Sequence, residues 1–299
     1  YPDAFDKYLT ANDPGINNQI KADIEDMKRK EDEKKKEKAK SLNSKKDLNI
    51  KKTLYPRGNI AFKCNYCDGG KSDLQVGFNG VCSDNIIKNN IEIEKRTWCS
   101  SHECQCLEYL MGRITRSELD NIHNNGNYVC YESQMLREWK ALAGVVQRGQ
   151  RKGEPMKLNK VQNNSLCILT TRLPNSNERD RFIFGVFLVD ENYEGDGSEA
   201  GYVTTKSKYK IKLSPKEAQK MLFWNYHANE NKPEIATWSS GLHRYFEDEQ
   251  AVQILKDIAS LKKGTKDESL ANEFLMHFSR INDIDIDLVT GNNGALMRT

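Results

Sequence analysis

The chain of 299 residues lacks several features that would identify common classes of protein. It has no run of about eighteen apolar residues, the length a helix needs to cross a membrane. Its first residues do not follow the charged and then apolar pattern of a secretory signal. We therefore expect no membrane-spanning helix. The chain begins at Tyr1 and not at a methionine, which leaves open that it is a piece of a longer protein.

Catalytic motifs are also missing. The sequence contains neither a Gly-x-x-x-x-Gly-Lys-Ser/Thr phosphate loop nor a Gly-x-Ser-x-Gly nucleophile turn. The nuclease triplet (Asp/Glu)-x-Lys occurs at Asp32-Glu33-Lys34, inside a highly charged segment where such triplets arise by chance. The five histidines are scattered along the chain, unlike the paired histidines of ββα-metal nucleases. We therefore predict no catalytic residue and expect a binding protein, with any nuclease supplied by another domain.

Cysteine, by contrast, is abundant, because six of the 8 cysteines fall within one short stretch. These six are Cys64, Cys67, Cys82, Cys99, Cys104 and Cys106. Two close pairs, at Cys64/Cys67 and Cys104/Cys106, are separated by a spacer long enough for the chain to fold back on one metal ion. Four thiolates close a structural zinc site. The sequence therefore predicts a bound Zn²⁺ that organises the fold of this segment.

The choice of ligands is open. We select Cys64, Cys67, Cys99 and one of Cys104 or Cys106, with Cys82 as the substitute, while His102 is also available. A thiolate-rich set indicates a structural zinc, and the zinc deaminase pattern is absent. An iron–sulfur cluster and disulfides are the alternatives. A Cys-x-Cys pair is poorly suited to bridging to itself, so zinc is favoured, and with it a reducing, cytoplasmic location.

Composition divides the chain into four parts. Residues 1–53 form a charged arm, predicted to be helical or disordered. Between Lys21 and Lys52 basic residues outnumber acidic ones by five, so the arm is suited to loose contact with a polyanion or to a solvated linker. Residues 54–150 are the cysteine-rich zinc module, with a strand at Asn59–Lys63, a helix starting near Arg116 and a helix over Glu132–Val146.

Residues 151–262 are predicted to form an α+β domain. Runs of β-branched and apolar residues indicate strands at Ser165–Thr171, Arg181–Asp190, Tyr202–Thr205 and Tyr209–Leu213. Helices are predicted from Ser214 to about Asn225 and over Asp248–Leu261. We expect these strands to form a mixed, strongly curved sheet or a small barrel with flanking helices. Residues 263–299 form a tail or the start of a further domain, with a helix over Leu270–Phe278 and an edge strand over Ile281–Val289.

Aromatic and polar residues gather densely near the end of the α+β domain. The candidate base-binding residues are Trp224, Tyr226, Trp238, Ser239, Ser240, His243, Arg244 and Tyr245. Aromatic walls with a few hydrogen-bonding groups are suited to stacking an extruded nucleobase. The alternative is that these rings fill a core.

Three features in order resemble the small β-barrel readers of the PUA, EVE and YTH type. They are a strand ending in Leu169-Thr170-Thr171, a strand over Phe184–Val189, and a loop reading Trp238-Ser239-Ser240-Gly241. The resemblance covers about residues 158–262. Such families read a modified or flipped base in an aromatic pocket, and bacterial members are often joined to nuclease domains that restrict modified foreign DNA. The resemblance implies a DNA-binding recognition protein of a bacterial restriction or defence system.

Two other functions compete with this one. The first is a zinc-stapled protein-interaction module without a small ligand. The second is an enzyme whose pocket holds a small substrate between His227, His243 and Arg244.

Overall fold

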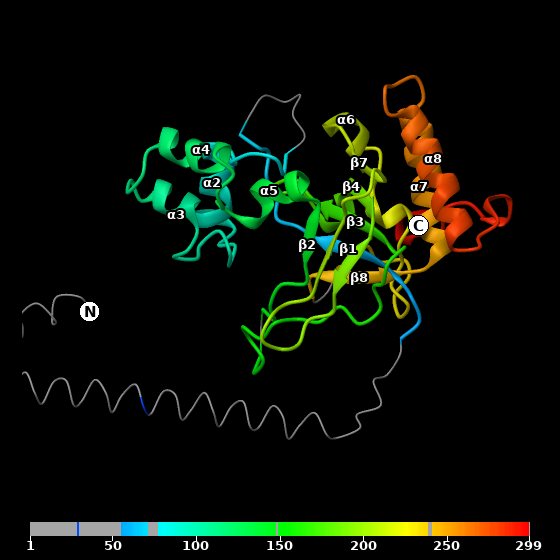
Figure 1. Ribbon diagram of the computed structural model, residues 1–299, viewed down its shortest axis with the longest axis horizontal. Helices are drawn as coiled ribbons and strands as arrows, with labels where there is room; N and C mark the ends of the chain where they lie inside the picture. The colour runs from blue at the N-terminus through cyan, green and yellow to red at the C-terminus, as the bar shows by residue number, and fades with distance from the viewer. Residues whose placement is uncertain (1–28, 30–54, 71–76, 148, 239–240, 299) are drawn as a thin grey trace, which may run out of the picture. The chain divides into compact units, whose positions relative to one another are not determined.

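The computed structural model describes Arg29 and residues 55–70, 77–147, 149–238 and 241–298 (Figure 1). Apart from Arg29, the predicted charged arm lies outside the described residues. Residues from Tyr55 onward form one compact unit. Its main sheet has five strands in the order β7-β4-β3-β1-β8. The strands are β1 (Asn59–Lys63), β3 (Leu166–Thr171), β4 (Phe182–Leu188), β7 (Lys210–Lys212) and β8 (His243–Phe246).

The main sheet is mixed. Strand β1 runs parallel to β3, and every other pair of neighbours is antiparallel. A register shift between Leu169 and Thr170 marks a bulge in β3. The strands seen in the described part of the chain do not close on themselves, since β7 and β8 are left as edges. The α+β class and the mixed sheet are thus confirmed, whereas the predicted alternative of a small barrel is not formed.

A second, antiparallel sheet has three strands, β2 (Lys140–Leu142), β6 (Tyr202–Thr204) and β5 (Glu191–Tyr193), in that order. The helices are α2 (Asp84–Lys88), α3 (Gln105–Leu110), α4 (Arg116–Asn124), α5 (Tyr131–Glu138), α6 (Pro215–Ala218), α7 (Asp248–Lys262) and α8 (Glu268–Ile281). A π-helical turn, η1 (Asn89–Ile93), follows α2. Single 3-10 turns are η2 (Glu178–Asp180), η3 (Phe223–Asn225), η4 (Ile286–Leu288) and η5 (Ala295–Met297). No helix in the described ranges is long and apolar enough to span a membrane.

The core lies on both faces of the main sheet. All residues of β3 and β4 are buried, which requires cover on both faces, as in sheets with helices on each side. Figure 1 shows α5 on one side of these strands and the α7–α8 pair on the other, with α2, α3 and α4 grouped beyond α5. Phe78 and Phe184 stack in this core with ring centroids 3.7 Å apart. The segments around these short helices carry Cys82, Cys99, Cys104 and Cys106.

Several predicted elements form where the sequence indicates them. Strand β1 covers the predicted residues, α7 matches the predicted Asp248–Leu261 helix, and α8 contains the predicted tail helix. Thr115 accepts a hydrogen bond from the backbone N–H of Glu118 and so caps α4. Ser214 caps α6 in the same way. These capping boxes are local in sequence, which is why they are predictable.

Three predicted elements differ. The helix expected over Glu132–Val146 ends at Glu138, because Trp139 takes a left-handed backbone (φ 49°) and the next residues pair with β6. The helix expected to run to Asn225 ends at Ala218. The edge strand expected over Ile281–Val289 is absent, since α8 runs to Ile281 and the following residues include the turn η4.

The main sheet draws on both sides of the boundary predicted near residue 150. Strand β1 comes from the predicted zinc module, yet it lies between β3 and β8 of the predicted α+β domain. Asn59 secures this junction, because its amide oxygen accepts from the backbone N–H of Leu166 at 2.7 Å and its amide nitrogen donates to Asp248 at 2.8 Å. The cysteine-rich segment is therefore continuous with the sheet.

Candidate metal centre and aromatic cluster

Five cysteine side chains line one small cavity between the short helices. They are Cys82, Cys99, Cys104, Cys106 and Cys130. The cavity has a volume of about 10 Å³, which is room for one ion or water-sized group. The carboxyl group of Glu132 also faces it, and burial raises the pKa of this group above its usual range. We call this set of residues the thiol cavity.

The thiols of the cavity interact in pairs. Hydrogen bonds join Cys104 to Cys106 and Cys106 to Cys130, while Cys82 pairs with Cys67. The bond from Cys106 lowers the pKa of the Cys104 thiol to about 7. For Cys106, its two thiol hydrogen bonds and then burial raise the pKa. Burial likewise raises the pKa of Cys99. The cavity thus combines one readily ionised thiol with neighbours held protonated by burial and by one another.

Local structure positions these thiols. Cys104 and Cys130 both occupy N-cap positions, of α3 and α5 respectively, so both precede a helix start. The loop carrying Cys67 is closed by Asp68, whose carboxylate accepts from the backbone N–H and the hydroxyl of Ser83 at 2.8 and 2.6 Å. Gly80 sits where a Cβ would come within 2.6 Å of the Gly69 carbonyl oxygen. Only glycine fits there, and this close approach brings Cys67 and Cys82 together.

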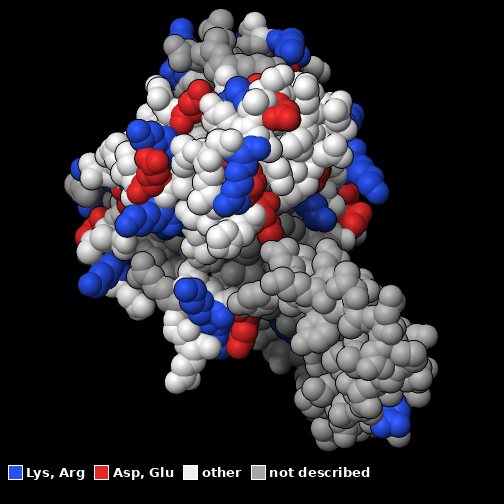
Figure 2. Space-filling view, turned by 90° about the vertical axis from the view of Figure 1, so that its left-hand side faces the viewer, with Lys and Arg blue, Asp and Glu red and all other residues white. Residues whose placement is uncertain are grey.

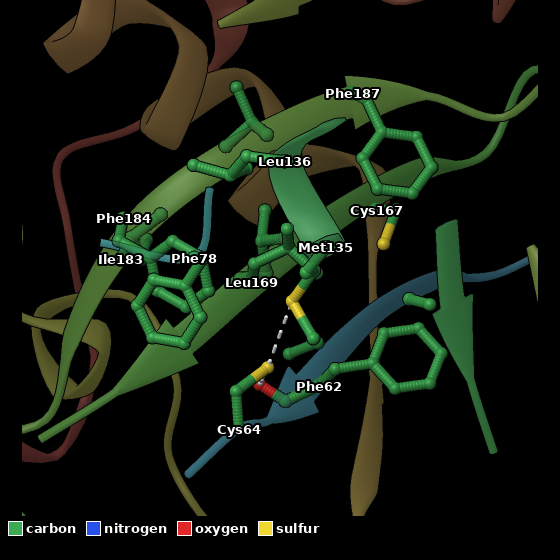
Figure 3. Close-up of a cluster of buried hydrophobic side chains, with 14 of the residues drawn as sticks. Phe62, Cys64, Phe78, Met135, Leu136, Cys167, Leu169, Ile183, Phe184 and Phe187 are labelled. Carbon is green, nitrogen blue, oxygen red and sulfur yellow. Dashed lines mark hydrogen bonds between the residues drawn. The ribbon is translucent and has the colours of Figure 1, made fainter. Parts of the chain in front are cut away.

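Two of the predicted ligands, Cys64 and Cys67, do not line the thiol cavity. Cys64 points into the core beneath the main sheet, where its sulfur lies 3.7 Å from the Met135 sulfur and 3.9 Å from the Phe62 carbonyl oxygen (Figure 3). Cys67 pairs with Cys82, and its thiol donates to the Gly80 carbonyl oxygen at 3.5 Å, but Cys67 does not itself line the cavity. His102, the one imidazole in this stretch, is exposed and is not part of the lining.

Cys130 is the member of the thiol cavity that the sequence analysis missed. It stands alone in the sequence, well after the cysteine cluster, and only the tertiary fold brings its thiol to that of Cys106. Cys130 lies two residues before the start of the predicted Glu132–Val146 helix, but a position before a helix does not by itself identify a metal ligand. In the residues that the structure describes, no three or more His, Cys, Asp or Glu side chains are arranged so as to hold a metal ion. The zinc site therefore stays a prediction.

The predicted base-binding residues fall into two sets. Trp224, Tyr226 and Trp238 are buried, with exposed fractions of 0%, 2% and 1%. Their polar atoms are satisfied: Trp224 Nε1 donates to the Glu178 carbonyl oxygen at 2.8 Å and Tyr226 donates to Asp257 at 2.6 Å. These rings belong to the core. Ser239 and Ser240 lie outside the described residues.

The second set surrounds Trp238 with cationic and imidazole groups. The guanidinium groups of Arg181 and Arg244 lie 5.0 and 5.4 Å from the Trp238 ring centroid, within the range of cation–π contacts. Arg244 also donates to the Trp238 carbonyl oxygen. Burial, followed by the Arg244 charge, lowers the pKa of both His227 and His243 to about 4.

The imidazoles in this set have unused polar atoms. The Nδ1 atoms of His227 and His243 are buried without a hydrogen-bond partner in the described part of the chain. Tyr245, on β8, faces away from Trp238 toward the loop at Asn159, whose backbone N–H it accepts from at 3.1 Å. The structure therefore brings Trp224, His227 and Arg244 together around Trp238, whereas His243 lies on the opposite face of β8 from Arg244 and packs against Tyr245, with ring centroids 5.3 Å apart. We call the former the Trp238 cluster.

Comparison with protein-family models, with curated proteins and with solved structures finds no match for this chain.

Proposed function

We propose that this chain is a nucleic-acid-binding recognition protein whose cysteine-rich segment is stabilised by a structural zinc ion and whose Trp238 cluster receives a base. The observation that carries the base-binding part is the Nδ1 atom of His227, which is buried without a hydrogen-bond partner in the described part of the chain. A buried polar atom without a partner costs free energy, and the polar edge of a base supplies one. Arg244 and Trp238 offer a cation and a ring on the same side as His227.

A base reaches this cluster only if a side chain moves. The Trp238 ring is buried and both arginines lie against it, so entry requires Arg244 to leave the ring. Arg244 is only half-buried and stands on the edge strand β8, which leaves it the room to do so. Stacking on an aromatic ring contributes about 1–3 kcal/mol per base, enough to offset the loss of one exposed cation–π contact of about 0.5–1 kcal/mol.

The support for zinc is the chemistry of the thiol cavity. Cys99, Cys104, Cys106 and Cys130 line an ion-sized space, and thiolates are the preferred ligands of structural zinc. Binding requires the thiols to release their protons and to turn from one another toward the ion. Its role is structural, since zinc would join α3 to α5 and thereby hold the short helices against the sheet. A thiolate site of this kind needs a reducing compartment, so we propose a cytoplasmic location.

The charge distribution restricts where a nucleic acid attaches. Figure 2 shows the face that carries the short helices, on which basic and acidic side chains are interspersed. Such a face provides no continuous track for a phosphate backbone. We therefore place the contact on the side of the main sheet. As the recognition part of a bacterial restriction or defence system, the protein would act with a nuclease supplied by another domain or chain.

Binding measured by fluorescence anisotropy tests this proposal. The zinc-loaded protein is titrated with matched unmodified and base-modified DNA duplexes across a salt series. We expect salt-dependent binding that favours one modification and that His227→Phe weakens about tenfold, because the substitution keeps a ring and removes the polar atoms. Trp98→Ala, which alters an exposed ring outside the cluster, serves as control. Absence of binding at low salt overturns the proposal in favour of a protein-interaction module.

A further inference from the structure

A second cavity, of about 280 Å³, opens beside the edge strand β7. Its polar wall consists of Asn79, Lys210, Lys212, Lys266 and Asp267, and its apolar wall includes Leu136 and Trp139. Neither the cysteine cluster nor the aromatic cluster of the sequence points to this place. We call it the β7 cavity.

The charge of the β7 cavity is positive. Lys210 and Lys212 are two apart on one strand and so project from the same face, while Lys266 reaches the cavity from the loop between α7 and α8. In the described ranges no carboxylate lies within ion-pair distance of these three lysines. The one acidic residue of the wall, Asp267, is already engaged, because the Lys262 ammonium lies 3.5 Å from its carboxylate. Three cationic groups are therefore available to an anion.

Trp139 supplies a ring held in a strained position. Its backbone is left-handed, with φ 49° and ψ 46°, a conformation that costs a bulky residue of order 1–3 kcal/mol. The ring is held edge-to-face against Phe187, with centroids 6.1 Å apart and planes at 82°. Because only part of the ring is buried, part of it remains to line the cavity. Strain of this kind gathers at ligand-binding positions, where the surrounding structure maintains it.

We propose that the β7 cavity binds a nucleoside phosphate, with the phosphate at Lys210, Lys212 and Lys266 and the base against Trp139. A volume of about 280 Å³ lies at the lower end of small-ligand pockets, which suits a single nucleotide. A bare phosphate ion uses the lysines and leaves the apolar wall exposed. An uncharged aromatic compound uses the wall and leaves three ammonium groups uncompensated. Only a ligand with both an anionic and an aromatic part matches both walls.

This chemistry has two sources, a free nucleotide or the phosphorylated end of a nucleic acid strand. The second source rests on the proposed nucleic-acid binding, while the first does not. Both share a terminal phosphate on a nucleoside, and the edge position of β7 leaves the cavity open to a strand end. The Trp238 cluster differs from this cavity in kind, because it offers polar edges to a base and no free ammonium groups.

The test uses the whole chain and three probes: adenosine monophosphate, a 5′-phosphorylated oligonucleotide and the same oligonucleotide with a 5′-hydroxyl. Binding is followed by calorimetry and by tryptophan fluorescence. We expect either the mononucleotide or the 5′-phosphorylated strand to bind, and the double variant K210Q/K212Q to bind about tenfold more weakly. Lys220→Gln, an exposed lysine outside the cavity, leaves affinity unchanged. Trp139→Leu is expected to reduce both the affinity and the fluorescence change.

Each outcome separates this inference from the proposed function. Binding of the mononucleotide alone identifies a free nucleotide as the ligand, and a preference for the 5′-phosphorylated strand identifies a strand end. If nucleic acid binds equally with and without the 5′-phosphate and K210Q/K212Q matches Lys220→Gln, the inference is wrong while the proposed function stands. If none of the three probes binds, the inference is overturned, and duplex binding at the Trp238 cluster remains a separate result.

Discussion

The ammonium group of Lys262 lies 2.9 Å from the carboxylate of Glu217, and this pair joins the end of α7 to α6. Only 5% of the Lys262 side chain and 17% of that of Glu217 are exposed. The same ammonium group donates to the Lys212 carbonyl oxygen at 3.1 Å and so reaches β7 as well. One buried lysine therefore connects α7, α6 and the edge strand β7, which borders the β7 cavity.

Removal of this charge should destabilise the fold. In Lys262→Met the Glu217 carboxylate loses its partner while it stays largely covered, and breaking such a pair costs about 3 kcal/mol. The free energy of unfolding, measured by urea denaturation, should fall by about this amount. Lys263→Met, at the exposed neighbouring position, should change it by less than about 0.5 kcal/mol. Equal stability of the two variants would show that the ion pair contributes nothing.

The cysteines should differ sharply in their effect on metal content. Cys106→Ser and Cys130→Ser each remove a thiol of the thiol cavity, so the purified protein should lose its zinc and the short helices should lose protection from hydrogen exchange. Cys167→Ser, in the core strand β3, should retain zinc. Atomic-absorption measurements decide between them. Full zinc content in Cys130→Ser would exclude this residue as a ligand.

Cys64 provides a second test of the ligand set. The sequence alone selects it as a ligand, whereas its sulfur packs against Met135 in the core. Cys64→Ala should therefore keep zinc and lower the free energy of unfolding by about 1–2 kcal/mol through the cavity it leaves. Loss of zinc in this variant, with the fold retained, would restore the sequence-based ligand choice.

Trp238→Ala should lower the stability of the fold itself. The ring is buried between two guanidinium groups, so its removal leaves a large cavity and should cost about 3–5 kcal/mol. Thermal unfolding followed by circular dichroism measures this loss. The exposed Trp98 offers a matched control, and Trp98→Ala should leave the melting temperature within a few degrees. A fully stable Trp238→Ala would place the ring outside the core.

Two largely buried imidazoles, those of His227 and His243, should make the protein sensitive to mild acid. Burial and Arg244 lower the pKa of His227 and His243 from 6.5 to about 4, so between these values the unfolded chain binds protons that the folded chain does not. The stability that depends on these neutral imidazoles is fully present above pH 6.5 and declines as the pH falls toward 4, by on the order of 3 kcal/mol for each imidazole. The free energy of unfolding, measured by denaturation at several pH values in this range, should depend less on pH in His243→Phe than in the unchanged protein. An unchanged pH dependence in this variant would contradict the assignment.

Local signals explain which parts of the fold were predictable. The β-branched run of Leu166–Thr171, the capping boxes at Thr115 and Ser214 and the period of the Asp248–Lys262 helix depend on neighbours along the chain. The helix after Glu132 is shorter than the sequence predicts, because apolar residues continue at helical spacing past Glu138. The left-handed turn at Trp139 and the pairing of Lys140–Leu142 with β6 override that period, and both depend on residues about sixty positions away.

The sequence by itself determined the α+β class, most of the strands and the concentration of thiols in one segment, because these follow from composition and short-range periodicity. Only the tertiary structure decided which thiols meet. Cys130 joins Cys106 and Cys64 turns to Met135, since packing of helices against the sheet and not spacing along the chain sets those neighbours. The β7 cavity has the same origin: its lysines come from a strand and a distant loop, and its ring from the end of α5.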